Sequence, residues 1–260
     1  MEEKIEPRES AEAPPAEAPP VLASIPPKSD RLMLAEAFGA SALVTAVVTL
    51  VSAFMVEKGV AISVAIVFLG ATWVLVWQRD DARVEHAGLS LAGLVLPGKV
   101  DLGRVLRAVG QSAGWTLVCA LLTFLPFFFG WKVWWRPRAH FVFSMPPYDL
   151  LNYVFGQLVI IALPEEAFYR GYLQTRFDDV FRGRVRILGA EVGWSLVVVS
   201  VIFALGHFAT IREPARLAVF FPSLLFGWLR ARTKGVGTGI LFHACCNIFS
   251  EILGRGFRVY

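Results

Sequence analysis

Charged residues are scarce in this chain. Only 18% of its 260 residues are Asp, Glu, Lys or Arg, while 56% are hydrophobic and the mean hydropathy is +0.58; soluble domains carry about 25% charged residues. The apolar residues gather in long blocks that short arginine-rich connections separate, which is typical of membrane-spanning helices. This pattern argues against a soluble domain and predicts an all-α, polytopic transmembrane helix bundle.

Cysteine is equally scarce. The three cysteines, Cys119, Cys245 and Cys246, all lie in apolar segments, and none are in CxxC spacing. This excludes a disulfide framework and a cysteine-based zinc site. The HExxH motif of zinc proteases is also absent. The net charge of +4 does not indicate nucleic-acid binding, because the arginines flank apolar blocks, where they anchor helix ends. The lipid bilayer is therefore the expected partner.

The first 31 residues contain two copies of AEAPP. A segment so rich in proline, alanine and glutamate cannot bury enough apolar surface to fold, so we expect a disordered cytoplasmic tail over residues 1–31 rather than a signal peptide. We divide the remainder into transmembrane and interfacial segments over residues 32–147 and a chemically active core over residues 148–256.

Seven apolar blocks follow the tail, so we expect seven to eight spans. Most basic residues fall on the side of the amino terminus, which by the positive-inside rule predicts a cytoplasmic amino terminus. The stretch 79–107, where arginines alternate with leucines and valines, is expected to be interfacial. The blocks are Leu34–Val56, Gly59–Trp77, Val109–Trp131, Leu150–Leu163 (continuing into charged residues), Val192–Phe208, Leu217–Leu229 and Gly237–Leu253.

Three segments place ionisable residues within the apolar blocks. A charged side chain at membrane depth costs roughly 2.5–3.5 kcal/mol on insertion scales, so such residues are candidates for function. The segments are ALPEEAFYRG (162–171), FALGH (203–207) and HACCN (243–247).

In the first segment, Glu166 and Arg170 are four residues apart, a spacing that favours an ion pair on a helix. Glu165 then has no cation nearby in sequence, and an unpaired carboxylate in an apolar environment becomes more basic, as a general base requires. Pro164 removes a backbone hydrogen bond and is expected to kink the helix. The structural alternative is a charge cluster at a helix end.

The other two segments supply histidines. His207 lies one turn after Phe203, and His243 lies one turn before Asn247, so that His243 and Asn247 can donate hydrogen bonds to one point, as a developing oxyanion requires. A structural histidine and an interhelical polar contact are the alternatives. At a rise of about 1.5 Å per residue, these side chains and Glu165 lie roughly 9–22 Å from the inner face. We therefore expect them to meet in one chamber in the cytoplasmic half of the bundle.

The ordered set EExxxR (165–170), FxxxH (203–207) and HxxxN (243–247) resembles the CPBP family of CAAX proteases and bacteriocin-processing enzymes, also called Abi or glutamic intramembrane proteases. The resemblance covers about residues 150–254, and the preceding helices match only as generic spans. The family core has eight spans, whereas seven blocks are counted here. The myxosortase-like branch is one candidate. The proline- and alanine-rich tail and the preference for arginine favour a bacterial inner-membrane protein and disfavour a prenylated substrate.

The resemblance implies an intramembrane endopeptidase that cleaves a membrane-associated, C-terminal segment of a protein or peptide and needs no metal cofactor. It implies that Glu165 activates water and that His207 positions it. His243 and Asn247 would stabilise the oxyanion, with Glu166 and Arg170 in support.

Three other classes stay open. Glu165 with His207 and His243 is also a legitimate zinc set, which would make the protein a membrane metalloprotease. A cysteine protease could use Cys246 beside His243. A bacteriocin-immunity protein, a scaffold or a transporter would carry intramembrane charges without catalysing hydrolysis.

Overall fold

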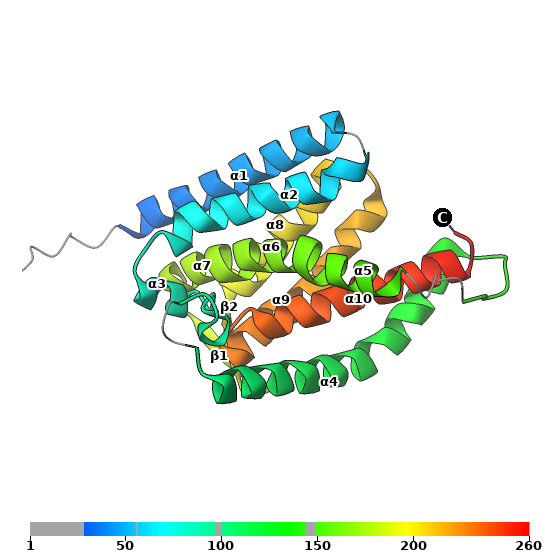
Figure 1. Ribbon diagram of the computed structural model, residues 1–260. Helices are drawn as coiled ribbons and strands as arrows, with labels where there is room; N and C mark the ends of the chain where they lie inside the picture. Colours follow the sequence, from blue (N-terminus) through cyan, green and yellow to red (C-terminus); the bar gives the residue numbers. More distant parts are fainter. Residues whose placement is uncertain (1–28, 56, 97–99, 144–148, 260) are drawn as a thin grey trace, which may run out of the picture.

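The computed structural model describes residues 29–55, 57–96, 100–143 and 149–259. Its helices run side by side along one common direction, and one short hairpin is attached at an end (Figure 1). Nearly all of the predicted tail lies outside the described residues. The elements that run along the bundle are α1 (Asp30–Phe54), α2 (Glu57–Thr72) with the π-helical segment η1 (Trp73–Trp77), α4 (Leu102–Trp135), a compound helix from Leu150 to Val180, α8 (Trp194–Thr210), α9 (Phe220–Thr233) and α10 (Gly237–Gly256).

The predicted transmembrane helix bundle is confirmed. Within the described ranges, four helices are long and apolar enough to cross a membrane, and the shorter helix Trp194–Thr210 is also apolar. The first helix starts at Asp30, where the Ser29 hydroxyl accepts a hydrogen bond from the amide of Leu32, as an N-cap does. The four candidate spans are Asp30–Phe54, Gly59–Trp77, Leu102–Trp135 and Leu150–Val180.

The compound helix from Leu150 to Val180 alternates between α-helical and π-helical turns. Pro164, in the short α-helical segment α6, has no amide hydrogen to donate, and wider π-helical turns lie on both sides of it. Such π-helical turns accommodate the missing hydrogen bond and often occur at functional sites, whereas the predicted kink stays a prediction. The segments are α5 (Leu150–Phe155), η3 (Gly156–Ala162), α6 (Leu163–Glu166), η4 (Ala167–Gln174) and α7 (Thr175–Val180).

The structure differs from the expected boundaries at three places. Helix α4 begins at Leu102 rather than near Val109, because Asp101 caps it by accepting from the amide of Gly103 at 2.8 Å. Helix α9 begins only at Phe220, after a 3₁₀ turn, η5 (Pro214–Val219). The third difference is an antiparallel hairpin, β1 (Arg184–Ile187) and β2 (Ala190–Gly193), that the apolar blocks did not indicate.

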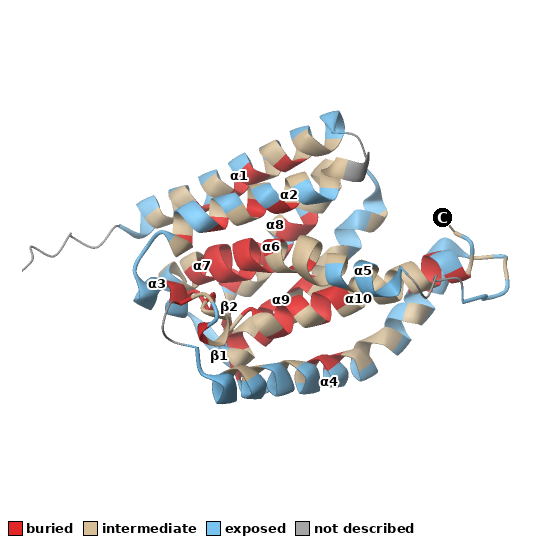
Figure 2. Ribbon diagram, in the orientation of Figure 1, coloured by how far each residue is buried: buried red, intermediate tan, exposed pale blue. Residues whose placement is uncertain are grey.

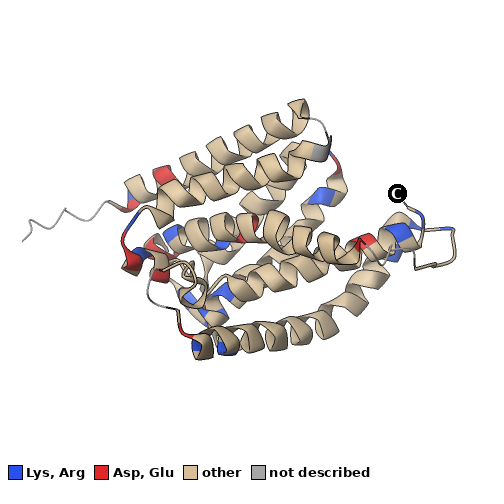
Figure 3. Cartoon of the chain, in the orientation of Figure 1, with Lys and Arg blue, Asp and Glu red and all other residues tan. Residues whose placement is uncertain are grey.

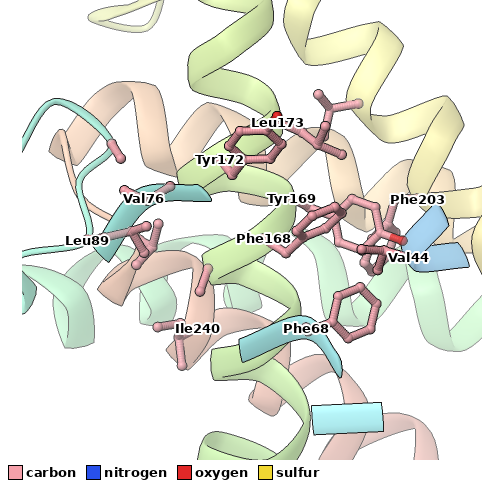
Figure 4. Close-up of a cluster of buried hydrophobic side chains, with 14 of the residues drawn as sticks. Val44, Phe68, Val76, Leu89, Phe168, Tyr169, Tyr172, Leu173, Phe203 and Ile240 are labelled. Atoms are coloured by element: carbon pink, nitrogen blue, oxygen red, sulfur yellow. The ribbon is translucent and has the colours of Figure 1, made fainter. Parts of the chain in front are cut away.

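The core is centred on the π-helical segment η4. All eight of its residues are buried, although a helix at the edge of a bundle would face lipid on one side. Figure 2 shows this burial, and Figure 4 shows the apolar side chains around it. The ring of Phe68 from α2 lies 5.6 Å from those of both Phe168 and Tyr169, and Tyr169 meets Phe203 of α8 edge-on at 4.9 Å. Polar side chains on η4 are therefore enclosed by protein.

Charged residues gather at the two ends of the bundle (Figure 3). At the end that holds the start of α1, Arg182 lies 3.8 Å from Asp30. In the same region, Arg230 of α9 donates to the carbonyl of His86 in α3 (Asp81–His86) at 2.8 Å. We call this the amino-terminal end. The opposite end, called the far end, holds the α1–α2 turn, the end of α4, η5 and the carboxyl terminus.

More basic side chains lie at the amino-terminal end, so the positive-inside rule predicts that this end is cytoplasmic. Cysteine labelling in a background without Cys119, Cys245 and Cys246 checks this orientation. A membrane-impermeant maleimide should label Arg212→Cys at the far end in intact spheroplasts, but Glu191→Cys on the hairpin only after lysis. The reverse pattern would contradict the predicted orientation.

Candidate active site

Three predicted side chains meet inside the bundle. Glu165 comes from α6, His207 from α8 and His243 from α10, and one carboxylate oxygen, Oε2 of Glu165, lies 3.9 Å from Nε2 of each imidazole. The side chains are 13%, 24% and 5% exposed, respectively. A separation of 3.9 Å is too long for a direct hydrogen bond and is suited to a bridging water.

Both imidazoles are oriented through Nδ1. His207 donates from Nδ1 to the carbonyl of Phe203 at 3.0 Å, since a carbonyl oxygen can only accept. Nδ1 of His243 is held by Oε1 of Glu166 at 3.0 Å. Each neutral ring with its proton on Nδ1 presents an Nε2 lone pair toward Glu165. A second proton would turn the same Nε2 into a hydrogen-bond donor.

The predicted pair of Glu166 and Arg170 is present and enclosed. Arg170 Nη1 lies 3.0 Å from Glu166 Oε1, and the two side chains are 1% and 0% exposed. The other terminal nitrogen, Nη2, donates to the hydroxyl of Ser223 at 2.6 Å and to its carbonyl at 3.2 Å. Glu166 thus holds a cation and an imidazole at the same oxygen, and α9 is tied to the same network.

Aromatic rings cover the guanidinium of Arg170. Its Cζ lies 4.6 Å from the ring centre of Phe203 and 5.1 Å from that of Phe226, distances at which the ring quadrupole attracts a cation. Phe226 also stacks against the imidazole of His243 at 4.7 Å. The same two phenylalanines therefore exclude solvent from the ion pair and hold one catalytic candidate in place.

Two glycines allow the helices to approach the site. A Cβ on Gly239 of α10 would lie 3.0 Å from Oε2 of Glu166, and a Cβ on Gly206 would lie 3.0 Å from the hydroxyl of Tyr169. Small residues at such positions are common where membrane helices pack closely.

Asn247 stands apart from the three side chains that meet. It lies one turn after His243 on α10, and its Nδ2 donates to Oε1 of Gln157 in η3 at 2.9 Å. An amide nitrogen carries two hydrogens, so a second donor remains on Nδ2. The predicted convergence of His243 and Asn247 on one point therefore stays a prediction.

Sequence reasoning missed the residues that hold this network. Ser223, Gln157 and Phe226 lie in apolar blocks without a motif of their own. The sequence offered one indication for Ser223 and Gln157, because a serine or glutamine within a membrane span usually has a polar partner. Only the packing of helices identifies Arg170 and Asn247 as those partners.

A cavity of about 310 Å³ adjoins Glu165 and His207. It passes between α1, α2 and α8 and reaches Ile211 and Arg216 at the far end. The sequence predicted a chamber in the cytoplasmic half. That location stays a prediction, because the structure does not assign a side of the membrane to either end. The cavity extends toward the far end, since the last turn of α8, which carries His207, lies close to it.

Comparison with known proteins supports the same segment. Residues 147–249 match the family described as type II CAAX prenyl endopeptidase Rce1-like, and this range contains all three motifs. The match covers less than half of the chain, and we call this part the Rce1-like domain. The family supports a CAAX-type intramembrane protease, and the four candidate spans agree with a membrane protein. The chain matches no curated protein and no solved structure.

We predict that Arg170→Ala destabilises the Rce1-like domain by about 3–5 kcal/mol, because it leaves Glu166 as a buried charge without its cation. The matched control is Arg182→Ala, since that side chain is 85% exposed and surface pairs contribute little. The level of each protein in membranes and its thermal midpoint in detergent provide the measurement. Normal accumulation and a normal midpoint for Arg170→Ala would contradict this account.

Proposed function

We propose that the protein is an endopeptidase that hydrolyses a peptide bond within the membrane by using water activated by Glu165. One observation carries the proposal. Oε2 of Glu165 is buried, makes no hydrogen bond among the described residues, and faces two imidazole nitrogens beside a cavity. A buried polar atom without a partner is rare in folded proteins. A water held between these three groups would satisfy it.

In this scheme Glu165 removes a proton from the water, and the resulting hydroxide attacks the carbonyl carbon of the scissile peptide bond. His207, fixed by Phe203, orients the water through Nε2. The carbonyl oxygen gains a negative charge in the tetrahedral intermediate. Protonated Glu165 then returns its proton to the leaving amine as the C–N bond breaks, which restores the carboxylate.

The oxyanion is stabilised by His243 and Asn247. His243 can donate from Nε2 when its ring is protonated, and the Glu166 carboxylate at Nδ1 stabilises that cation as a buried aspartate does in the serine protease triad. Asn247 offers its remaining amide hydrogen. Glu166 and Arg170 act as positioning residues, because they touch His243 and the helices rather than the reacting atoms.

The substrate we propose is a membrane-anchored protein or peptide, cleaved in a C-terminal segment. The apolar side chains that line the cavity beside Glu165 come mostly from α2 and η3, which suits a segment that arrives from the bilayer rather than a nucleic acid. We place the protein in the cytoplasmic membrane of a bacterium, with its amino terminus inside.

A zinc hydrolase is the second candidate, since both Nε2 atoms face one carboxylate oxygen. Ligand atoms that share a tetrahedral zinc ion at about 2.0–2.2 Å lie roughly 3.3 Å apart, so the 3.9 Å separations would have to shrink. Across the described part of the chain, no group of three His, Cys, Asp or Glu side chains has metal-site spacing. The water-bridged arrangement needs no such movement.

Glu165→Gln should abolish cleavage, because it removes the base while keeping the size of the side chain. Asn247→Ala should retain some activity, with kcat lower by about 10²–10³, the usual effect of losing one oxyanion donor. Cleavage of a membrane-anchored reporter, normalised to the amount of folded protein, provides the measurement. Normal turnover by a folded Glu165→Gln protein would refute the mechanism, and a phenotype that is unaffected by Glu165→Gln would favour a non-enzymatic role.

Chelation separates the two hydrolytic mechanisms. The purified protein should keep its activity after prolonged treatment with a chelator and should contain no stoichiometric zinc by elemental analysis, because the proposed scheme requires no cation. Inactivation that added zinc reverses would instead assign Glu165, His207 and His243 as ligands.

A further inference from the structure

The cavity beside Glu165 ends in polar groups that the proposed reaction does not use. Arg216, in η5, lines it at the far end and is exposed there, and its guanidinium makes no hydrogen bond or ion pair among the described residues. Ser52 of α1 also lines the cavity, and its buried hydroxyl lacks a hydrogen-bond partner in the described part of the chain. A cation and an unsatisfied hydroxyl thus border the same space.

The cavity changes in character along its length. Its charged lining residues differ in exposure, because the side chain of Glu165 is 13% exposed whereas Arg216, in η5 at the far end, is exposed and marks the mouth. Apolar side chains such as Val64 and Ile160 also line it. Its volume of about 310 Å³ lies at the lower limit of the roughly 300–1,000 Å³ typical of ligand pockets. A cavity of this size and lining can hold an apolar peptide segment of a few residues.

The two charged residues that line the cavity have opposite signs. A carboxylate would be repelled by Glu165 and attracted by Arg216. Charge complementarity of this kind sets orientation and specificity more than affinity. An anionic group on the substrate would therefore remain at the mouth, while the apolar part extends toward Glu165.

We propose that Arg216 is a specificity-determining residue that binds a carboxylate of the substrate a few residues from the scissile bond, with Ser52 as a further donor. The carboxylate is either the free C-terminus or an Asp or Glu side chain. The assignment rests on the proposed function. It also means that the substrate reaches the site from the far end of the bundle, which the distribution of basic residues places outside the cytoplasm.

The proposal is tested with three quenched fluorescent peptides, each composed of Ala, Val and Leu, and the full-length protein in detergent micelles. One has a free C-terminal carboxylate, one is amidated, and one is amidated but carries an internal Asp. We expect kcat/KM about fivefold to tenfold higher for one or both carboxylate peptides, through KM rather than kcat, as for a partly exposed charged hydrogen bond. Which peptide is preferred identifies the source of the carboxylate. The preference should fall in 0.5 M salt.

Arg216→Gln should remove this preference, and Arg216→Glu should reverse it in favour of a peptide with Lys in place of Asp. Arg212→Gln is the matched control, because Arg212 is an exposed arginine at the same end that does not line the cavity. The control should behave as the wild type. An unchanged preference in Arg216→Gln, or equal kcat/KM for all three peptides, would overturn the assignment.

Binding separates this proposal from the proposed function. Fluorescence anisotropy of the same three peptides, made with the fluorophore but without the quencher, is measured with Glu165→Gln alone and combined with Arg216→Gln. A carboxylate preference that disappears in the double variant supports the role of Arg216, whether or not the wild type cleaves any peptide. Absence of cleavage by the wild type would instead count against the proposed peptidase activity. Equal affinities of Glu165→Gln for charged and amidated peptides would overturn the role of Arg216.

Discussion

A buried ion pair holds this site together. Arg170 contacts Glu166, Ser223 and the faces of two phenylalanines, and Glu166 in turn holds His243. Five helical segments, α6, η4 and α8 to α10, thus meet at two opposite charges that are enclosed by protein. Removing either charge alone leaves the other uncompensated at a cost of about 3–5 kcal/mol. The geometry of His243, and with it the distance to Glu165, depends on this pair.

The π-helical turns explain how one helix can carry both the ion pair and the reactive carboxylate. Glu165 and Glu166 are adjacent, so their side chains point in different directions around the helix. Glu166 faces α10 and joins the closed network, while Glu165 borders the cavity between α1, α2 and α8. Wider turns on both sides of Pro164 tolerate its missing hydrogen bond. Glu166 thereby binds Arg170 and His243 through Oε1, whereas Oε2 of its neighbour Glu165 faces the two Nε2 atoms without a hydrogen bond among the described residues.

The arrangement of charges connects the site to the membrane. The amino-terminal end carries most of the basic residues, whereas the cavity leads to the far end and to Arg216. A peptidase with this geometry would act on segments exposed on the less basic side of the bilayer. Glu165 at depth and Arg216 at the mouth would then separate the reactive and the anionic parts of a substrate.

Hydropathy and i,i+4 spacing are local properties, so the amino-acid sequence alone was enough to predict the membrane class, the four candidate spans and the pairing of Glu166 with Arg170. The three motifs also identified the family segment. Only the tertiary structure shows that Glu165 lies equally far from His207 and His243. It also shows that Ser223 binds Arg170 and Gln157 binds Asn247, and where the cavity extends. These facts depend on how helices distant in sequence pack and rotate against one another. The hairpin and the 3₁₀ turn before α9 were missed because they follow from turn residues and proline rather than from apolar periodicity.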